Sequence, residues 1–167
     1  IRKKSKRINI GYVGRYTKEK GFDRFIQLKE KLEVNIKNIK FNFYAYGDKK
    51  KKNYEIISKE IIYNNKEIAK FYSKIDILIF PSRGDSVGLA QLEALSSGAI
   101  ILASNNNGSK QLKKIFNDQI FIINNWNLDG AFKKIREIIE KLETASKKLI
   151  SQNQDNFLIE NWKDIFR

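Results

Sequence analysis

The chain has 167 residues, of which 41% are hydrophobic and 31% charged, a composition typical of one folded domain with a core of its own. Its formal net charge of +14 at pH 7 favours an anionic partner such as nucleotide phosphates, nucleic acid or an anionic membrane surface. The absence of cysteine and histidine excludes disulfides, thiolate nucleophiles, histidine bases and the commonest metal ligands.

Other global features narrow the class of protein. The lysine-rich runs at 2–7 and 49–52 also fit a solvated surface without any partner. No apolar run is long enough for a transmembrane helix, no signal peptide is evident, and the lack of cysteine fits the cytosol. The sequence starts at Ile1 and contains no methionine, so we expect residues 1–167 to be a single domain excised from a longer protein.

Short apolar runs and amphipathic stretches alternate from the start of the chain. The run INIGYV at 8–13 predicts a buried strand, and GFDRFIQLKEKL at 21–32 carries apolar residues near helical period. A second strand is expected at 41–46, and the run EIIY at 60–63 indicates a short third one.

The same alternation continues through the middle of the chain. A helix over 66–75 is expected to lead into a strand at 76–80. A helix over 89–97 then ends at Gly98, before a strand at 99–103.

The last third predicts a helix over 109–116, a strand at 120–123 and a long helix over 128–143, followed by two further helical stretches. Strands that alternate with helices indicate parallel βαβ units, and strands that are apolar on both sides need helices on both faces of the sheet. We therefore predict an α/β fold: a doubly wound, Rossmann-like parallel sheet of about six strands with a helical C-terminal end.

In such sheets, ligands bind beyond the carboxyl ends of the strands, which puts Gly14, Gly47 and the loop 81–88 on one rim. The loop after the first strand also carries Arg15 and Lys20. These two cations can clamp a diphosphate, the arginine as a fork and the lysine as a point charge, and the following helix adds its dipole. A surface loop in a lysine-rich protein explains the pair equally well.

The segment DSVGLAQLE places one acid, Asp85, in a glycine-bearing loop and another, Glu93, in the helix that follows. Unpaired N–H groups at a helix start can hold an anion, whereas carboxylates repel phosphate and accept hydrogen bonds from hydroxyls. A nucleotide sugar, with phosphates between two hydroxyl-bearing rings, suits both kinds of group. Alternatively, Asp85 is an N-cap and Glu93 a solvent-facing charge, although a carboxylate in so apolar a stretch should be paired or face a ligand.

Several motifs resemble, in order and spacing, the carboxyl-terminal half of the group 1 retaining glycosyltransferases, also called family 4. They are VGRYTKEKGFDRFI, YGD, SKIDILIFPSRGDSVGLAQLEALSSGAIILAS and NNGSKQL. The resemblance runs from about residue 8 to the end, and its most specific element is the pair of acids with seven residues between them. It implies an enzyme of the GT-B type, in which two Rossmann-like domains face each other across a cleft. The amino-terminal, acceptor-binding domain would lie outside this chain.

The resemblance also implies roles for the charged residues. Arg15 and Lys20 match the pair that holds the donor diphosphate, and they stabilise the charge that develops on it during catalysis. Asp85 matches the first acid, near the hydroxyls of the donor sugar, and we expect it to be catalytic as well. Glu93 matches the second acid, which binds the ribose hydroxyls.

Further donor contacts are implied around these residues. Backbone amides meet sugar and phosphate along the segment Ser86, Val87, Gly88 and Leu89. Tyr63 or Ile62 borders the expected base pocket. Such enzymes usually need no metal, so we expect neither a metal site nor another cofactor.

The sequence departs from the family pattern at two acids. The first acid is usually glutamate and here is Asp85, one methylene shorter. A later family glutamate is replaced by Gln111. Both departures give weight to the alternative that this is a catalytically dead donor-binding domain.

The activity that the resemblance implies is transfer of a hexose, with retained configuration, from a nucleoside diphosphate sugar. Bacterial enzymes of this kind commonly build lipopolysaccharide, capsule or other lipid-linked glycans. We favour mannose carried by GDP over a UDP-linked sugar. We expect the chain to bind the donor but to be inactive without the amino-terminal domain. A cytoplasmic location is expected, peripheral to the inner face of the membrane.

Two other classes of protein are compatible with parts of the pattern. A nucleotide-sugar epimerase would share the base and diphosphate sites, with a different spacing of acids. A basic nucleic-acid-binding module would expose aromatic residues among its cations, whereas here the aromatics fall mostly at core positions. We therefore expect no nucleic acid partner.

Overall fold

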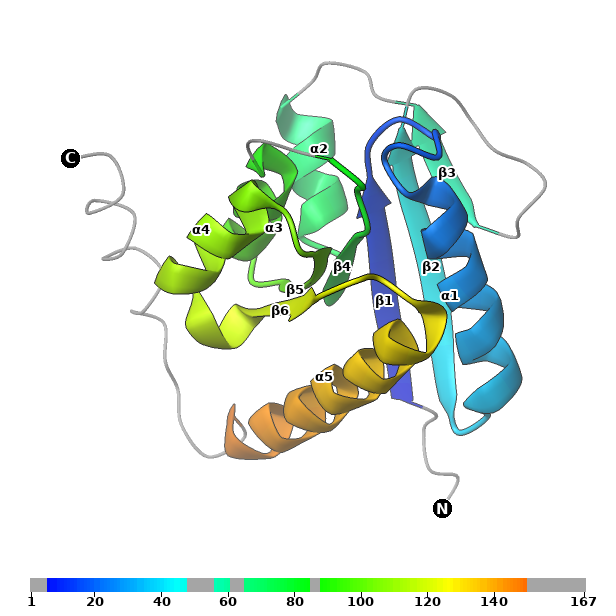
Figure 1. Cartoon of the computed structure of the whole chain (residues 1–167). Helices are drawn as coiled ribbons and strands as arrows, with labels where there is room; N and C mark the ends of the chain where they lie inside the picture. Colours follow the sequence, from blue (N-terminus) through cyan, green and yellow to red (C-terminus); the bar gives the residue numbers. More distant parts are fainter. Residues whose placement is uncertain (1–5, 48–55, 61–64, 85–87, 150–167) are drawn as a thin grey trace. The chain divides into compact units, whose positions relative to one another are not determined.

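The computed structural model of the chain describes residues 6–47, 56–60, 65–84 and 88–149 (Figure 1). By its internal contacts the chain divides into two compact units, residues 1–134 and 135–167. The strands belong to the first unit, and the last helix begins there and continues into the second. The assignment of residues 1–167 to one nucleotide-sugar-binding domain stays a prediction.

The first unit is built on a parallel sheet that has six strands within the described residues. The strands are β1 (Lys6–Val13), β2 (Ile39–Gly47), β3 (Ile57–Glu60), β4 (Ile77–Phe80), β5 (Ile100–Ser104) and β6 (Ile120–Ile123). Their order is β3-β2-β1-β4-β5-β6, and each strand is parallel to its neighbours. The chain thus builds outward from β1 to β3 and then returns to the other side of β1. The topological switch point, where open α/β sheets bind ligands, lies between β1 and β4.

The described helices are α1 (Phe22–Asn35), α2 (Asn65–Tyr72), α3 (Leu89–Ser96), α4 (Asn107–Ile115), the short 3-10 helix η1 (Asn117–Gln119) and α5 (Leu128–Leu149). Helices of the first unit cover both faces of its sheet (Figure 1). Helix α1 lies on one face, and α2, α3 and α4 lie on the other (Figure 1). The first turns of α5 lie beside α1, because Lys31 forms an ion pair with Asp129 and its amine is 5.5 Å from the centroid of the Phe132 ring. The predicted doubly wound, Rossmann-like class is confirmed.

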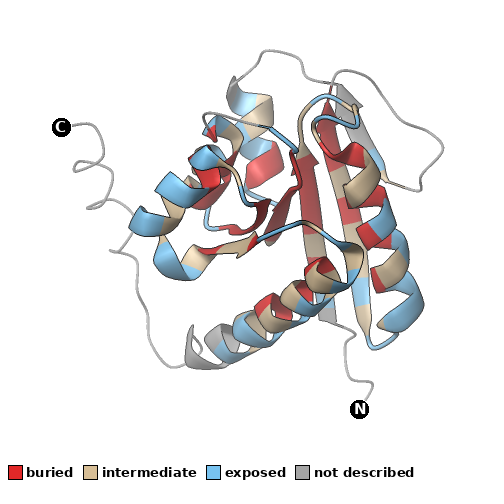
Figure 2. Ribbon diagram, viewed as in Figure 1, coloured by how far each residue is buried: buried red, intermediate tan, exposed pale blue. Residues whose placement is uncertain are grey.

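The core follows from the apolar runs. Every residue of β4 and β5 is buried, as two-sided covering requires (Figure 2). Helix α1 buries Phe22, Phe25, Ile26 and Leu32 at helical spacing. Lys29 lies on the same buried stripe, and its amine reaches Glu33 Oε2 at 2.7 Å, so the buried charge is paired.

Within the described residues the expected strands and helices are present, and the start of one edge strand differs from the expectation. We expected the third strand at 60–63, whereas β3 spans Ile57–Glu60, and the residues after it lie outside the described ones. The pairing of Tyr44 with Ile57 fixes this earlier register. Residues at the edge of a sheet are partly open to solvent, and Ile57 is 55% exposed. The mostly polar sequence ISKE can therefore form a strand there without an apolar run.

Among the described helices, none combines the length and hydrophobicity that crossing a lipid bilayer requires. We expected the long helix to end at 143 and two further helical stretches to follow it, whereas α5 continues as one helix to Leu149. The rest of the expected helical region lies outside the described residues.

Candidate functional site

The loop between β1 and α1 carries the predicted basic pair, and hydrogen bonds fix its shape. The buried Tyr12 hydroxyl donates to the Arg15 carbonyl at 2.6 Å from beneath the loop. The Thr17 N–H donates to the same carbonyl at 2.8 Å, and the Lys20 N–H reaches Thr17 Oγ1 at 3.3 Å. The Arg15 side chain stays 60% exposed, with a loose contact of 3.9 Å to Glu19. The loop therefore has a set backbone and presents a guanidinium to solvent.

Two glycines bring the ends of β1 and β2 together on the rim. The Gly14 N–H donates to the Tyr46 carbonyl at 3.0 Å, and Gly14 has a φ of 142° that favours glycine. A Cβ on Gly47 would lie 2.7 Å from the Gly14 carbonyl oxygen and 2.3 Å from the Tyr16 ring. The predicted neighbourhood of Gly14 and Gly47 on one rim is thus confirmed by a contact that only glycine permits.

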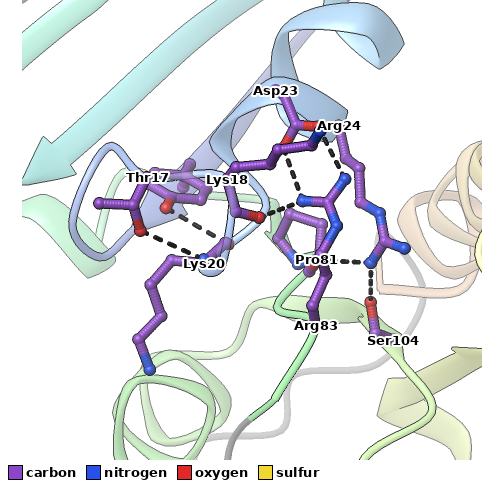
Figure 3. Close-up of polar contacts among 9 residues, drawn as sticks. Thr17, Lys18, Lys20, Asp23, Arg24, Pro81, Arg83 and Ser104 are labelled. Carbon is purple, nitrogen blue, oxygen red and sulfur yellow. Dashed lines mark hydrogen bonds and ion pairs between the residues drawn. The ribbon is translucent and has the colours of Figure 1, made fainter.

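An ion pair fastens the β1–α1 loop to the loop that follows β4. The Arg83 guanidinium donates two hydrogen bonds to the Asp23 carboxylate, at 2.8 and 2.7 Å, and a third to the Lys18 carbonyl (Figure 3). The Arg83 N–H also donates to the Glu19 carbonyl at 2.8 Å. We call the Arg83–Asp23 pair the latch. The Lys20 side chain extends away from it (Figure 3).

A second arginine, Arg24 of α1, contacts the backbone of the loop that follows β4. Arg24 Nη1 donates to the Pro81 carbonyl at 2.9 Å and lies 3.4 Å from Ser104 Oγ, so the first turn of α1, the loop after β4 and the end of β5 meet at one guanidinium. The Arg24 Cζ lies over the Trp126 ring, 5.6 Å from its centroid. Burial lowers the pKa of Arg24, and the neighbouring positive charge of Arg83 acts in the same direction.

The two residues of the latch shift each other's pKa. The hydrogen bonds from Arg83 hold the pKa of Asp23 below its ordinary value, although burial acts against this. The same hydrogen bonds raise the pKa of Arg83. Both groups are therefore charged throughout the neutral range, and the latch is closed there.

Replacing Arg83 with alanine is expected to lower the free energy of unfolding by about 1 kcal/mol near pH 7, since the latch is bidentate but partly exposed. The pKa of Asp23 is depressed by folding, so the contribution of the latch is complete above the unfolded value of 3.8. It is lost as the pH falls through the folded pKa. Denaturant unfolding of both proteins between pH 7 and pH 2 measures this.

The matched control is Arg136→Ala, which removes the same charge from an exposed position on α5. We expect it to change the free energy of unfolding by less than about 0.5 kcal/mol. A difference between wild type and Arg83→Ala that stayed constant down to pH 2 would show that Asp23 is not the partner that matters.

The start of α3 forms the opposite side of the rim. Gly88 is buried at the N-cap, and a Cβ there would lie 2.6 Å from Gln91 Nε2. Gln91 is itself fully buried, and its Oε1 is 3.1 Å from Ser109 Oγ. Ser109 N–H in turn donates at 2.9 Å to Asn106 Oδ1, which caps α4. These contacts tie the first turns of α3 and α4 to each other.

Two amide nitrogens in this group, Gln91 Nε2 and Asn106 Nδ2, are buried without a hydrogen-bond partner in the described part of the chain. Leu89, by contrast, is 64% exposed at the first position of α3. The role of Leu89 as a donor contact stays a prediction.

The second predicted acid, Glu93, lies in the second turn of α3 and is exposed. It is nevertheless paired, because the buried Tyr72 hydroxyl donates to Glu93 Oε2 at 2.9 Å. Burial raises the pKa of the Tyr72 hydroxyl far above its ordinary value, and the negative charge of Glu93 adds to this. The tyrosine is therefore always a donor here.

The structure thus joins part of the predicted site. Gly14, Arg15, Lys20 and Gly47 lie in one contact region, and the latch ties it to the loop that leads from β4 toward α3. Five predicted residues lie outside the described ones: Ile62, Tyr63, Asp85, Ser86 and Val87. In the part of the chain that the structure describes, no group of three or more acidic side chains is arranged to hold a metal ion. The roles of all these residues in donor binding stay predictions.

Sequence reasoning overlooked several residues that shape the rim. Asp23, Arg24 and Arg83 look like ordinary surface charges in a lysine-rich chain, and no local signal pairs residues 60 positions apart. Gln91 did carry a signal, because it and Glu93 are the two polar side chains in the run GLAQLEAL. Asn106, three residues before Ser109, has the spacing of an N-cap.

Comparison with known proteins identifies the family. Residues 1–155 match the family model of the glycosyl transferases group 1, so the chain belongs to that family. An uncharacterised 41.2 kDa protein in the cps region of Klebsiella pneumoniae is 35% identical over 104 residues, which are 59% of this chain and 28% of that protein. A glycogen synthase of Clostridium botulinum is 26% identical over 171 residues, which are 91% of this chain and 33% of the synthase. The chain therefore spans about a third of the length of these curated relatives.

Solved structures share the fold. The C-terminal domain of a group 1 glycosyl transferase from Francisella tularensis superposes with a TM-score of 0.65 at 21% identity, over 80% of this chain and 75% of that one. An α,α-trehalose-phosphate synthase from Burkholderia xenovorans gives a TM-score of 0.63 at 16% identity, over 80% of this chain and 36% of that one. At these identities the likeness concerns the fold alone.

Proposed function

We propose that this chain is the donor-binding part of a retaining glycosyltransferase. The observation that carries this is the meeting of two loops at the switch point between β1 and β4. One loop presents Arg15 and Lys20, and the latch fixes it to the loop that leads toward α3. A diphosphate across this rim would meet two cations from one side and the N–H groups at the start of α3 from the other.

The chemistry assigned to these groups is stabilisation of a leaving diphosphate. In the transfer, the bond between the anomeric carbon and the phosphate oxygen breaks, and the electron pair leaves with the diphosphate. The acceptor hydroxyl oxygen then bonds to the same face of the sugar, and its O–H bond breaks as the proton passes to an oxygen of the leaving diphosphate. Arg15, Lys20 and the dipole of α3 would stabilise the growing negative charge, which supplies charge neutralisation from fixed groups without requiring a metal.

The remaining donor contacts follow from the same placement. Asp85 would accept hydrogen bonds from the sugar, with Ser86, Val87, Gly88 and Leu89 around it, and Glu93 would accept from the ribose. We propose a hexose as the sugar, with mannose on GDP preferred to a UDP-linked donor. A lipopolysaccharide, capsule or other lipid-linked glycan would be the acceptor, and the relative from a cps region supports a role in polysaccharide synthesis.

The acceptor site and any assisting base would come from an amino-terminal domain of the same protein.

We further propose a cytoplasmic protein that associates with the inner face of the membrane through its basic surface, given the net charge of +14. Co-sedimentation with vesicles that contain anionic lipid tests this, and binding that is insensitive to anionic lipid and to salt would contradict it.

Calorimetric titration of the purified protein with GDP, UDP and ADP tests the proposed function. We expect saturable binding with a preference for one base, and weaker binding of the corresponding monophosphate, which lacks one phosphate group for the cations to hold. Equal and salt-labile binding of all three nucleotides and of inorganic pyrophosphate would indicate only a basic surface. No binding by a protein shown to be folded would contradict the proposal.

A further inference from the structure

The hydrogen bond between Tyr72 and Glu93 joins a core side chain to a surface acid. Tyr72 is the last residue of α2, is 1% exposed, and packs its ring 5.5 Å from that of Phe71. Its hydroxyl reaches Glu93 Oε2, at 2.9 Å, across the contact between α2 and α3. The ring is held by packing, so the position of its hydroxyl is held as well.

The direction of this bond is fixed. A carboxylate can only accept here, and the phenol stays protonated because burial and the charge of Glu93 both raise its pKa. The single proton of Tyr72 therefore points at Glu93 Oε2. The other carboxylate oxygen, Oε1, has no hydrogen-bond partner within the described residues. One oxygen of Glu93 is thus anchored, and the other remains for a ligand.

We propose that Tyr72 is a positioning residue, which holds the Glu93 carboxylate in the orientation that accepts from the ribose hydroxyls of the donor. Tyr72 has this role only if Glu93 binds ribose, so this inference rests on the proposed function. An exposed glutamate otherwise samples several rotamers, and fixing one of them before the ligand arrives removes part of the entropy lost on binding. Removing the Tyr72 hydroxyl should therefore weaken the part of the binding that depends on the ribose hydroxyls, and leave the parts that depend on the base and the phosphates unchanged.

Replacing Tyr72 with phenylalanine removes the hydroxyl and leaves the ring beside Phe71. We expect the affinity for GDP or UDP, whichever binds more tightly, to fall about 3- to 20-fold. The affinity for the matching 2′,3′-dideoxynucleoside diphosphate, which has no ribose hydroxyl to offer, should be unchanged. The ratio of the two dissociation constants, measured by calorimetry, should therefore shrink in the variant. A purely structural loss would weaken both ligands in parallel and leave this ratio unchanged.

Two further variants complete the test. Tyr44→Phe removes the same atom from a half-buried tyrosine of the same core cluster, whose hydroxyl makes no hydrogen bond within the described chain, and should leave the ratio at the wild-type value. Glu93→Ala should abolish the preference for ribose altogether. Thermal unfolding of each variant confirms that it is folded.

The possible results distinguish failure of the positioning role of Tyr72 from failure of the proposed function. If Glu93→Ala removes the preference for ribose and Tyr72→Phe leaves it intact, the positioning role is overturned and the proposed function stands. If the wild type binds the ribose and dideoxyribose forms equally, Glu93 does not read ribose and Tyr72 has nothing to position. If the wild type binds neither form, the proposed function itself fails. A reduced preference in Tyr72→Phe, beside a normal Tyr44→Phe, supports the role.

Discussion

Replacing Gly21 with alanine is expected to lower the free energy of unfolding by about 2–5 kcal/mol, which corresponds to a fall in Tm of roughly 5–15 °C. Two effects add. Gly21 caps α1 with a φ of 76°, where a Cβ is unfavourable by about 1–2 kcal/mol. That Cβ would also lie 2.2 Å from the Pro81 carbonyl oxygen, so the β1–α1 loop would have to move away from the loop after β4. Thermal and denaturant unfolding measure the loss.

The chain contains a matched control for the backbone effect alone. Gly98 follows the C-cap of α3 with a φ of 86°, and a Cβ built on it meets no atom within 4 Å. Gly98→Ala should therefore destabilise by only about 1–2 kcal/mol. The difference between the two variants isolates the close approach of the two loops. Equal effects of Gly21→Ala and Gly98→Ala would mean that the loops separate without a penalty, and that their contact is not a rigid part of the rim.

The fold was predictable because it depends on local periodicity. Four- to eight-residue apolar runs, separated by amphipathic stretches, leave little choice but a parallel sheet covered on both faces. The start of the edge strand was not predictable, because side chains at an edge do not need to be apolar, and the expected residues 61–63 lie outside the described ones. Its position is set by pairing with β2, with Tyr44 opposite Ile57, which is information that a local pattern does not contain.

The candidate site was predictable only where residues suited to binding a ligand lie in a loop at the carboxyl end of a strand. Arg15 and Lys20 stood out because two cations follow a strand, at the edge where parallel sheets bind ligands. Arg83 and Asp23 did not stand out, because their structural role is an ion pair between segments that lie far apart in the sequence. Tyr72 escaped notice for the same reason. Its helical position predicts a core residue, and only the three-dimensional contact shows that its polar end holds an acid.

Replacing Arg15 or Lys20 with alanine is expected to weaken binding of the nucleoside diphosphate about 10- to 100-fold. Each side chain would contribute a charge-assisted hydrogen bond to phosphate, worth about 1.5–3 kcal/mol. Arg15→Lys should recover only part of the loss, because an ammonium cannot form the two parallel bonds of a guanidinium. Calorimetric titration with GDP and UDP measures these changes, and the free nucleoside should bind equally to all the proteins.

Lys18→Ala provides the control for charge alone. Lys18 is exposed in the same loop, and its backbone carbonyl, which accepts from Arg83, is retained in the variant. The variant has the same net charge as Arg15→Ala, so a general attraction of phosphate to a basic surface would weaken binding equally in both. A diphosphate held between the fixed β1–α1 loop and the start of α3 would instead leave Lys18→Ala close to wild type. Equal losses at all three positions would show that the loop attracts phosphate without placing it, and the assignment of Arg15 and Lys20 as a donor clamp would then be wrong.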